Sequence, residues 1–241
     1  MSDSTENRKR KMDDSGQSEN PKKPKLPSNF RYVHDPFTKK IICRVDKIQP
    51  KSPKYIEIAN TVEFKKNANK VEKTGLKVHE VFIVTYSDVS KPYTKFRDSV
   101  KEDKVKNRIL GFHVTDTTNT QPLLIQGFDQ RLARFRNRFG RGLYFTDDPL
   151  KANLYWRVHN KRNLRMMLGV VLNLGKMKIY PPNVIDPKLL REPEGYDSVK
   201  GQLLGKTEYV IYDGSRANIR YIITYRDENT KKSLEKNLNI T

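Results

Sequence analysis

Few residues of the kinds that commonly carry chemistry occur in this chain, and their spacing excludes several reaction classes. Cys43 is the only cysteine, so neither an intrachain disulfide nor a cysteine-based zinc site can form. The histidines have no metal-ligand spacing, and we expect no bound metal; they are His34, His79, His113 and His159. Phosphate-transfer and common hydrolase chemistry lack support, because the sequence contains no P-loop, no G-x-S-x-G and no G-x-G-x-x-G after a strand.

Histidine, tyrosine and glutamate instead recur in short segments that follow one another in the second half of the chain. In order, these are Leu110-Gly-Phe-His-Val-Thr115, Gln126-Gly-Phe-Asp129, Phe139-Gly-Arg-Gly-Leu-Tyr-Phe145, Lys151-Ala-Asn-Leu-Tyr155, Gly195-Tyr-Asp-Ser-Val199 and Lys206-Thr-Glu-Tyr-Val-Ile-Tyr-Asp213. Any one segment is a weak signal. In this order, over about Ile109 to Tyr225, they resemble the catalytic domain of the poly(ADP-ribose) polymerase superfamily.

This resemblance implies an enzyme that transfers ADP-ribose from NAD to protein or nucleic acid acceptors and releases nicotinamide, with NAD as a substrate. Carried over by position, the catalytic triad of the family falls on His113, Tyr144 and Glu208. A further family tyrosine, which stacks on nicotinamide, falls on Tyr155.

The implied chemistry suits these residue types. Breaking the bond between nicotinamide and ribose develops positive charge on the ribose, which the Glu208 carboxylate can stabilise. We expect His113 to donate a hydrogen bond to a ribose hydroxyl. The rings of Tyr144 and Tyr155 can enclose the flat, cationic nicotinamide through stacking and cation–π attraction.

The sequence departs from the family pattern at two positions of the expected nicotinamide pocket. Val114 stands where the family usually has glycine, and its β-branched side chain is stiff and bulky. Ala152 stands where members commonly have a serine whose hydroxyl binds the nicotinamide carbonyl. Both changes predict weaker nicotinamide binding, and neither touches Glu208.

Arginines are dense between Asp129 and Arg141, where the family has a loop over the donor site. Two interpretations are equally supported. The segment is a solvated basic loop, or its arginines, Arg141 among them, bind the NAD pyrophosphate or an anionic acceptor.

The elements that must position these residues are mostly short strands. Ser52-Pro53 predicts a helix through about Lys66, and Asp147 or Asp148 with Pro149 predicts another through Tyr155. Apolar, β-rich runs predict strands at 78–86, 109–114, 142–146, 168–174, 208–212 and 219–225. We therefore expect an α+β fold of the ADP-ribosyltransferase type, with two packed antiparallel sheets and flanking helices.

The ends of the chain differ in composition from this domain, which we place at 29–230. Residues 1–28 read as a disordered basic tail, and 231–241 as a charged C-terminal tail. Two basic clusters within 8–25 have the form of a bipartite nuclear localisation signal, which predicts importin binding and a nuclear location. The net charge of +20 favours weak, non-specific nucleic acid binding. No apolar run predicts a membrane span.

Three functions are compatible with these observations. The leading one is a nuclear protein ADP-ribosyltransferase. The second is a non-catalytic module that keeps the fold and binds nucleic acid or chromatin through its basic surface, which Val114 and Ala152 favour. The third is an enzyme like the NAD-dependent RNA 2′-phosphotransferases, on the same fold. The segment around Glu208 resembles the polymerases more. The sequence decides neither the acceptor nor the length of the ADP-ribose product.

Overall fold

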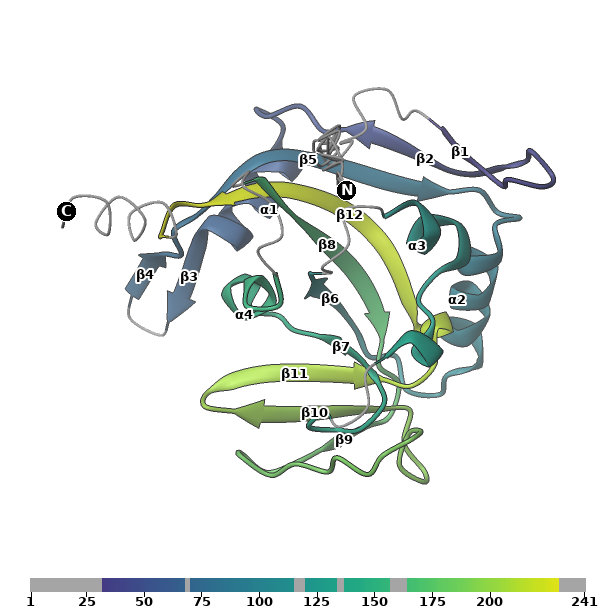
Figure 1. Cartoon of the computed structure of the whole chain (residues 1–241), viewed down its shortest axis with the longest axis vertical. Coiled ribbons are helices and arrows are strands. Elements are labelled where there is room, and N and C mark those ends of the chain that lie inside the picture. The colour runs from purple at the N-terminus through teal and green to yellow at the C-terminus, as the bar shows by residue number, and fades with distance from the viewer. Residues whose placement is uncertain (1–31, 68–69, 115–119, 134–136, 157–163, 230–241) are drawn as a thin grey trace, which may run out of the picture.

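Two β-sheets face one another in the structure, a computed structural model that describes residues 32–67, 70–114, 120–133, 137–156 and 164–229 (Figure 1). The expected N-terminal tail and localisation signal, the charged C-terminal tail and His159 lie outside these ranges. The domain boundaries and the nuclear signal therefore stay predictions.

The larger sheet has six strands, and every neighbouring pair is antiparallel. Across the sheet the strands are β1 (Tyr32–His34), β2 (Ile41–Lys47), β5 (Leu76–Tyr86), β12 (Ala217–Asp227), β8 (Leu164–Asn173) and β6 (Arg108–His113). The central strands β5, β8 and β12 are long and mostly buried, as their runs of valine, isoleucine and leucine predict. A separate hairpin is formed by β3 (Phe64–Asn67) and β4 (Lys70–Lys73).

The smaller sheet has four strands, in the order β7 (Leu143–Phe145), β11 (Lys206–Ile211), β10 (Ser198–Leu203) and β9 (Met177–Ile179). It differs in one respect from the antiparallel sheet that we predict, because β9 pairs with β10 in parallel. The chain between them crosses over the sheet instead of turning back in a hairpin, and a crossover returns the chain in the same direction.

Four α-helices lie beside the sheets in the described part of the chain: α1 (Pro53–Glu63), α2 (Lys91–Glu102), α3 (Gln121–Gln126) and α4 (Pro149–Asn153). Two 3-10 turns, η1 (Gln130–Leu132) and η2 (Gly214–Arg216), complete the elements. Figure 1 shows α2 and α3 at one end of the sheets, and α4 near the other end. No helix in these ranges is long and apolar enough to span a bilayer.

Capping explains where two of these helices begin. The Ser52 hydroxyl accepts a hydrogen bond from the backbone amide of Tyr55, and Asp148 caps the first turn of α4 in the same way. The predicted helix starts are thus confirmed. Both predicted helices end early, since α1 stops at Glu63, where β3 begins, and α4 stops at Asn153.

The apolar core has three parts. The main cluster fills the space between the two sheets, and a second lies between the large sheet, α1 and α4. A third packs Phe139 against Val199 and Val210 of the small sheet and against Tyr212, which follows β11. The expected α+β class, two facing sheets with flanking helices, is confirmed.

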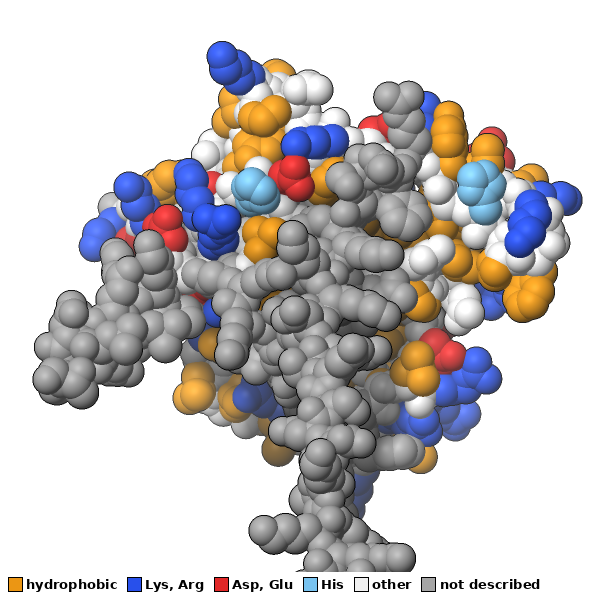
Figure 2. All heavy atoms as spheres, turned by 45° about the horizontal axis from the view of Figure 1, so that its top comes forward, with side chains coloured by type: hydrophobic (Ala, Val, Ile, Leu, Met, Phe, Trp, Pro, Cys, Tyr) orange, Lys and Arg blue, Asp and Glu red, His pale blue; other side chains and the backbone are white. Residues whose placement is uncertain are grey.

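Where the described residues are in view in Figure 2, Lys and Arg side chains lie beside acidic and apolar ones. Several of the described lysines have an acidic neighbour, such as Lys47 with Glu80 and Lys77 with Glu63. Because such exposed ion pairs reduce the local positive field, this face gives no separate support to nucleic acid binding, which stays a prediction.

Candidate active site

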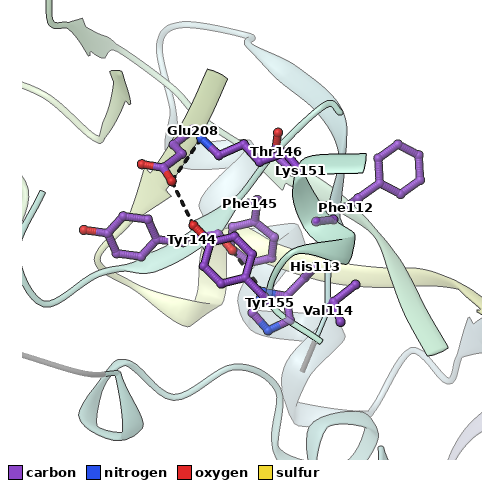
Figure 3. Close-up of a pocket in the computed structure, with 10 residues that line it drawn as sticks. Phe112, His113, Val114, Tyr144, Phe145, Thr146, Lys151, Tyr155 and Glu208 are labelled. Carbon is purple, nitrogen blue, oxygen red and sulfur yellow. Dashed lines mark hydrogen bonds and ion pairs between the residues drawn. The ribbon is translucent and has the colours of Figure 1, made fainter. Parts of the chain in front are cut away.

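Four of the six segments singled out by sequence contribute to one pocket, beside the point where the two sheets meet (Figure 3). No residue of Gln126–Asp129 or Gly195–Val199, which both lie within the described ranges, lines it. An antiparallel bridge between Phe112 and Thr146 joins β6 of the large sheet to the end of β7. The pocket holds about 340 Å³ of empty space, part of it open to solvent. Its lining residues are Phe112, His113, Val114, Tyr144, Phe145, Thr146, Lys151, Ala152, Tyr155 and Glu208.

His113 lies at the end of β6, where its ring is fixed from two directions. Its Nδ1 lies 2.9 Å from the backbone carbonyl oxygen of Tyr144. The rings of Phe128 and Phe145 pack against it with centroids 5.4 and 5.3 Å away. Burial lowers the pKa of His113, although the bond to the carbonyl acts in the opposite direction. The ring is therefore neutral at pH 7.

This contact changes the role that we expect for His113. A carbonyl oxygen can only accept, so Nδ1 must carry the proton of the neutral ring. The other nitrogen, Nε2, then has a lone pair and no proton. A neutral His113 can thus accept a hydrogen bond from a ribose hydroxyl, whereas the sequence-based expectation made it the donor.

Tyr144, in β7, has its hydroxyl engaged by the loop that precedes it. The hydroxyl accepts from the backbone amide of Phe139 at 2.8 Å and donates to the carbonyl of Gly140 at 3.0 Å. Gly140 has φ +65°, and a Cβ atom there would lie 1.7 Å from the carbonyl oxygen of Leu189, so only glycine fits. The bound hydroxyl leaves the ring of Tyr144 as the part that lines the pocket.

Glu208, in β11, is buried, with 3% of its surface exposed. Its Oε1 meets three donors: the hydroxyl of Tyr155 at 2.9 Å, Nζ of Lys151 at 3.0 Å and Nη1 of Arg138 at 3.3 Å. In the described part of the chain, Oε2 receives no hydrogen bond. The two cations and the phenol hold the carboxylate in place through Oε1, and the described residues leave the lone pairs of Oε2 unused.

Lys151 is a site residue that sequence reasoning missed. Its side chain is 4% exposed, and burial lowers its pKa although Glu208 acts to raise it. A lysine on a short helix normally reads as solvated, which is why only its place in the Lys151–Tyr155 segment could have indicated a role.

Tyr155 follows α4 and remains half exposed, with its hydroxyl donating to Glu208. Burial, with a contribution from Glu208, raises the pKa of this phenol, so it stays protonated and can donate at neutral pH. Figure 3 shows the rings of Tyr144 and Tyr155 on the pocket side of Glu208. Both predicted stacking tyrosines thus line the pocket.

The two departures from the family pattern form an apolar part of the pocket wall. Val114 and Ala152 are 5% and 1% exposed and belong to the core cluster between the large sheet, α1 and α4. The Val114 side chain therefore contributes to packing, and Ala152 offers the pocket a methyl group where a hydroxyl could have donated.

Arg141 does not line the pocket. Its Nη2 donates to the backbone carbonyl of Arg131 at 2.5 Å, and its own carbonyl accepts from the side chain of Gln130 at 2.6 Å. Arg138, from the same arginine-dense segment, is the residue that reaches Glu208. Which arginine of this segment reaches Glu208 could not be predicted from sequence, because it depends on how the loop packs against Leu189.

A histidine, two tyrosines and a glutamate around one cleft between two sheets define the class as an ADP-ribosyltransferase domain. Residues 52–206 match the family described as the poly(ADP-ribose) polymerase catalytic domain, and the chain belongs to this family. The match ends two residues before Glu208. The role of that residue is therefore supported by its place in the pocket.

Proposed function

We propose that the protein is an NAD-dependent ADP-ribosyltransferase that modifies protein acceptors and releases nicotinamide. The observation that carries the proposal is Glu208, a buried carboxylate that lines the pocket, with Oε1 held by three donors and with no hydrogen bond to Oε2 from the described residues. Membership of a family whose domains use NAD as substrate agrees with it.

The reaction that this site supports begins when the bond between ribose C1′ and the nicotinamide nitrogen breaks and nicotinamide leaves with the electron pair. The ribose becomes oxocarbenium-like, and the Glu208 carboxylate stabilises its positive charge. An acceptor nucleophile then forms a bond to C1′ and loses its proton to solvent or to a nearby base. His113, fixed as an acceptor at Nε2, holds the sugar in register.

The direct test is incubation of the full chain with labelled NAD and a protein mixture, followed by gel analysis and measurement of free nicotinamide. Transfer of label and release of nicotinamide, both lost in Glu208→Gln, are the expected result. Wild-type protein that binds NAD and releases no nicotinamide would overturn the proposal.

A second candidate function is a binding module that lacks transferase activity. The apolar wall formed by Val114 and Ala152 favours it, because a pocket without that hydroxyl has fewer groups to orient nicotinamide. A thermal-shift measurement with NAD and a nicotinamide mimic separates the two candidates. No shift with either compound favours the module.

The basic N-terminal segment and the net charge bear on where the protein acts and on what else it binds. We infer a nuclear location from the basic clusters within residues 8–25, and weak nucleic acid binding from the net charge of +20. Replacement of Lys9, Arg10, Lys22 and Lys23 by alanine in a fluorescent fusion tests the first inference. An unchanged distribution would exclude the signal.

A further inference from the structure

A second buried carboxylate contacts α4 and has no part in the chemistry above. Asp227, at the end of β12, accepts from Nη1 of Arg165 at 2.8 Å and from Nδ2 of Asn153 at 2.9 Å. Nη1 of Arg165 also donates to Oδ1 of Asn153 at 2.7 Å, and the hydroxyl of Tyr225 does so at 2.9 Å. All four side chains are buried.

Asn153 connects this cluster to the candidate active site through its neighbours in the chain. Lys151 lies two residues before it and Tyr155 two residues after it, and both hold Oε1 of Glu208. Asn153 itself contacts the large sheet, through Arg165 of β8 and Asp227 of β12. The short helix α4 is thus fixed to the sheet at Asn153 and to Glu208 on both sides of that residue.

Stability alone is a weak reason for such a cluster. Removing a buried ion pair from water costs much of what the pair gains, and apolar residues of similar volume often stabilise a fold equally well. Hydrogen bonds are directional, so the cluster restricts the position and orientation of α4 relative to the large sheet.

We propose that Asn153, Arg165 and Asp227 are positioning residues for the active site, and that they set the placement of Lys151 and Tyr155 at Glu208 by fixing α4 to the large sheet. The proposal rests on the proposed function for its catalytic consequence. A displacement of about 1 Å in a catalytic group can cost on the order of 10²-fold in rate.

The chain contains a matched control for this proposal. Asp103, Arg216 and Asn173 form a second cluster of the same residue types. Nδ2 of Asn173 and Nη1 of Arg216 each lie 2.7 Å from Oδ2 of Asp103. This cluster connects the residue after α2 to η2 and β8, and none of its members lines the pocket.

The experiment compares Asn153→Ala with Asn173→Ala in the full chain. Trp156 is the only tryptophan, packs against the cluster between α1, α4 and the large sheet, and directly follows Tyr155. Its emission and its quenching by acrylamide therefore report on the placement of this segment without requiring catalysis. The other measurements are Tm, the rate of nicotinamide release and the KM for NAD.

Both single variants should lower Tm, by roughly 5–15 °C, because each removes a buried asparagine from an ion-pair network, which is buried around Asp227 and partly buried around Asp103. At a temperature where both are folded, only Asn153→Ala should change the Trp156 signal and lower kcat, by about 10- to 100-fold. A triple variant, Asn153→Leu with Arg165→Met and Asp227→Leu, should recover much of Tm while kcat stays low.

Two results would overturn the proposal: a folded Asn153→Ala variant with wild-type Trp156 emission and kcat, or a triple variant whose kcat recovers together with Tm. The second would show that the cluster only stabilises. If wild-type protein releases no nicotinamide, the proposed function fails instead. The Trp156 comparison between Asn153→Ala and Asn173→Ala then still decides whether the cluster fixes α4.

Discussion

Glu208 and Asp227 are both buried carboxylates held by α4 or by residues next to it. They differ in how many of their oxygens accept hydrogen bonds from the protein, and we relate this difference to a catalytic role for Glu208 and a structural role for Asp227. Asp227 accepts hydrogen bonds at both oxygens: Oδ2 from Asn153 and Arg165, and Oδ1 from the backbone amide of Asn229. Glu208 accepts at Oε1 alone within the described residues.

This comparison teaches how to recognise the reactive carboxylate in such a fold. Burial and pairing with a cation are common to both groups, so neither feature is diagnostic. The distinguishing feature is that one oxygen, Oε1, is held by donors, while Oε2 receives no hydrogen bond from the described residues. A carboxylate that accepts from the protein at both oxygens has fewer lone pairs left for a substrate hydroxyl, and its neighbouring cation offsets part of its charge.

The largest effect on stability is expected at Asp227. Asp227→Ala leaves the Arg165 guanidinium buried without its carboxylate, and should lower the free energy of unfolding by about 3–5 kcal/mol. Urea denaturation of wild type and variant measures the difference. A loss under about 1 kcal/mol would mean that the pair is more solvated than its burial indicates, and the contrast with Glu208 would weaken.

Glu208→Gln should affect turnover much more than stability. The amide oxygen can still accept from Lys151 and Tyr155, so the fold should lose less than in Asp227→Ala. Turnover should fall by about 10²–10³-fold, because the charge that stabilises the ribose cation is gone. Nicotinamide release at saturating NAD measures this. A Gln variant with wild-type turnover would show that Glu208 is as structural as Asp227.

The pH dependence of NAD binding should reflect His113. Its pKa lies below the ordinary value of 6.5, so the ring stays neutral and Nε2 stays an acceptor throughout pH 7–8. NAD affinity should be flat there and decrease only in acid, by about tenfold per pH unit below the lowered pKa. The stability contributed by the neutral ring is complete above pH 6.5 and is lost as pH falls from there towards the folded-state value.

Titration calorimetry with NAD between pH 5 and 8 follows this dependence, with His113→Gln as the control that should remove the acid limb. A decrease in affinity that begins above pH 7 would contradict the lowered pKa of His113 and the neutral ring inferred from it.

Much of this arrangement could be predicted from sequence, because the signals were local. Hydrophobic runs identify β5, β8 and β12, caps identify the starts of α1 and α4, and the ordered segments identify the family. The parallel pairing of β9 could not be predicted, since it depends on where a crossover returns the chain. Hydrogen-bond direction at His113, the burial of Lys151 and the reach of Arg138 depend on tertiary contacts between distant segments.

The smallest expected effect is on inhibitor affinity and concerns the pocket wall, where Ala152 stands in place of a residue with a hydroxyl. Ala152→Ser should tighten the binding of a nicotinamide-mimicking inhibitor, because a neutral hydrogen bond contributes about 0.5–1.5 kcal/mol, or roughly two- to tenfold. The serine has a competing acceptor in the carbonyl of Asp148, which already accepts from the amide of residue 152. The gain should therefore lie at the lower end of this range.

Val114→Gly is harder to interpret than Ala152→Ser because it also lowers stability, although it restores the residue type that the family usually has. Val114 is 5% exposed and packs in the core, so its removal leaves a cavity that costs stability. Inhibitor dissociation constants for Ala152→Ser are best compared with Tyr155→Ala, which removes the ring expected to stack on the ligand. If Tyr155→Ala binds the inhibitor as tightly as wild type, nicotinamide does not stack on Tyr155. A tighter Ala152→Ser variant would then reflect some other pose in the pocket.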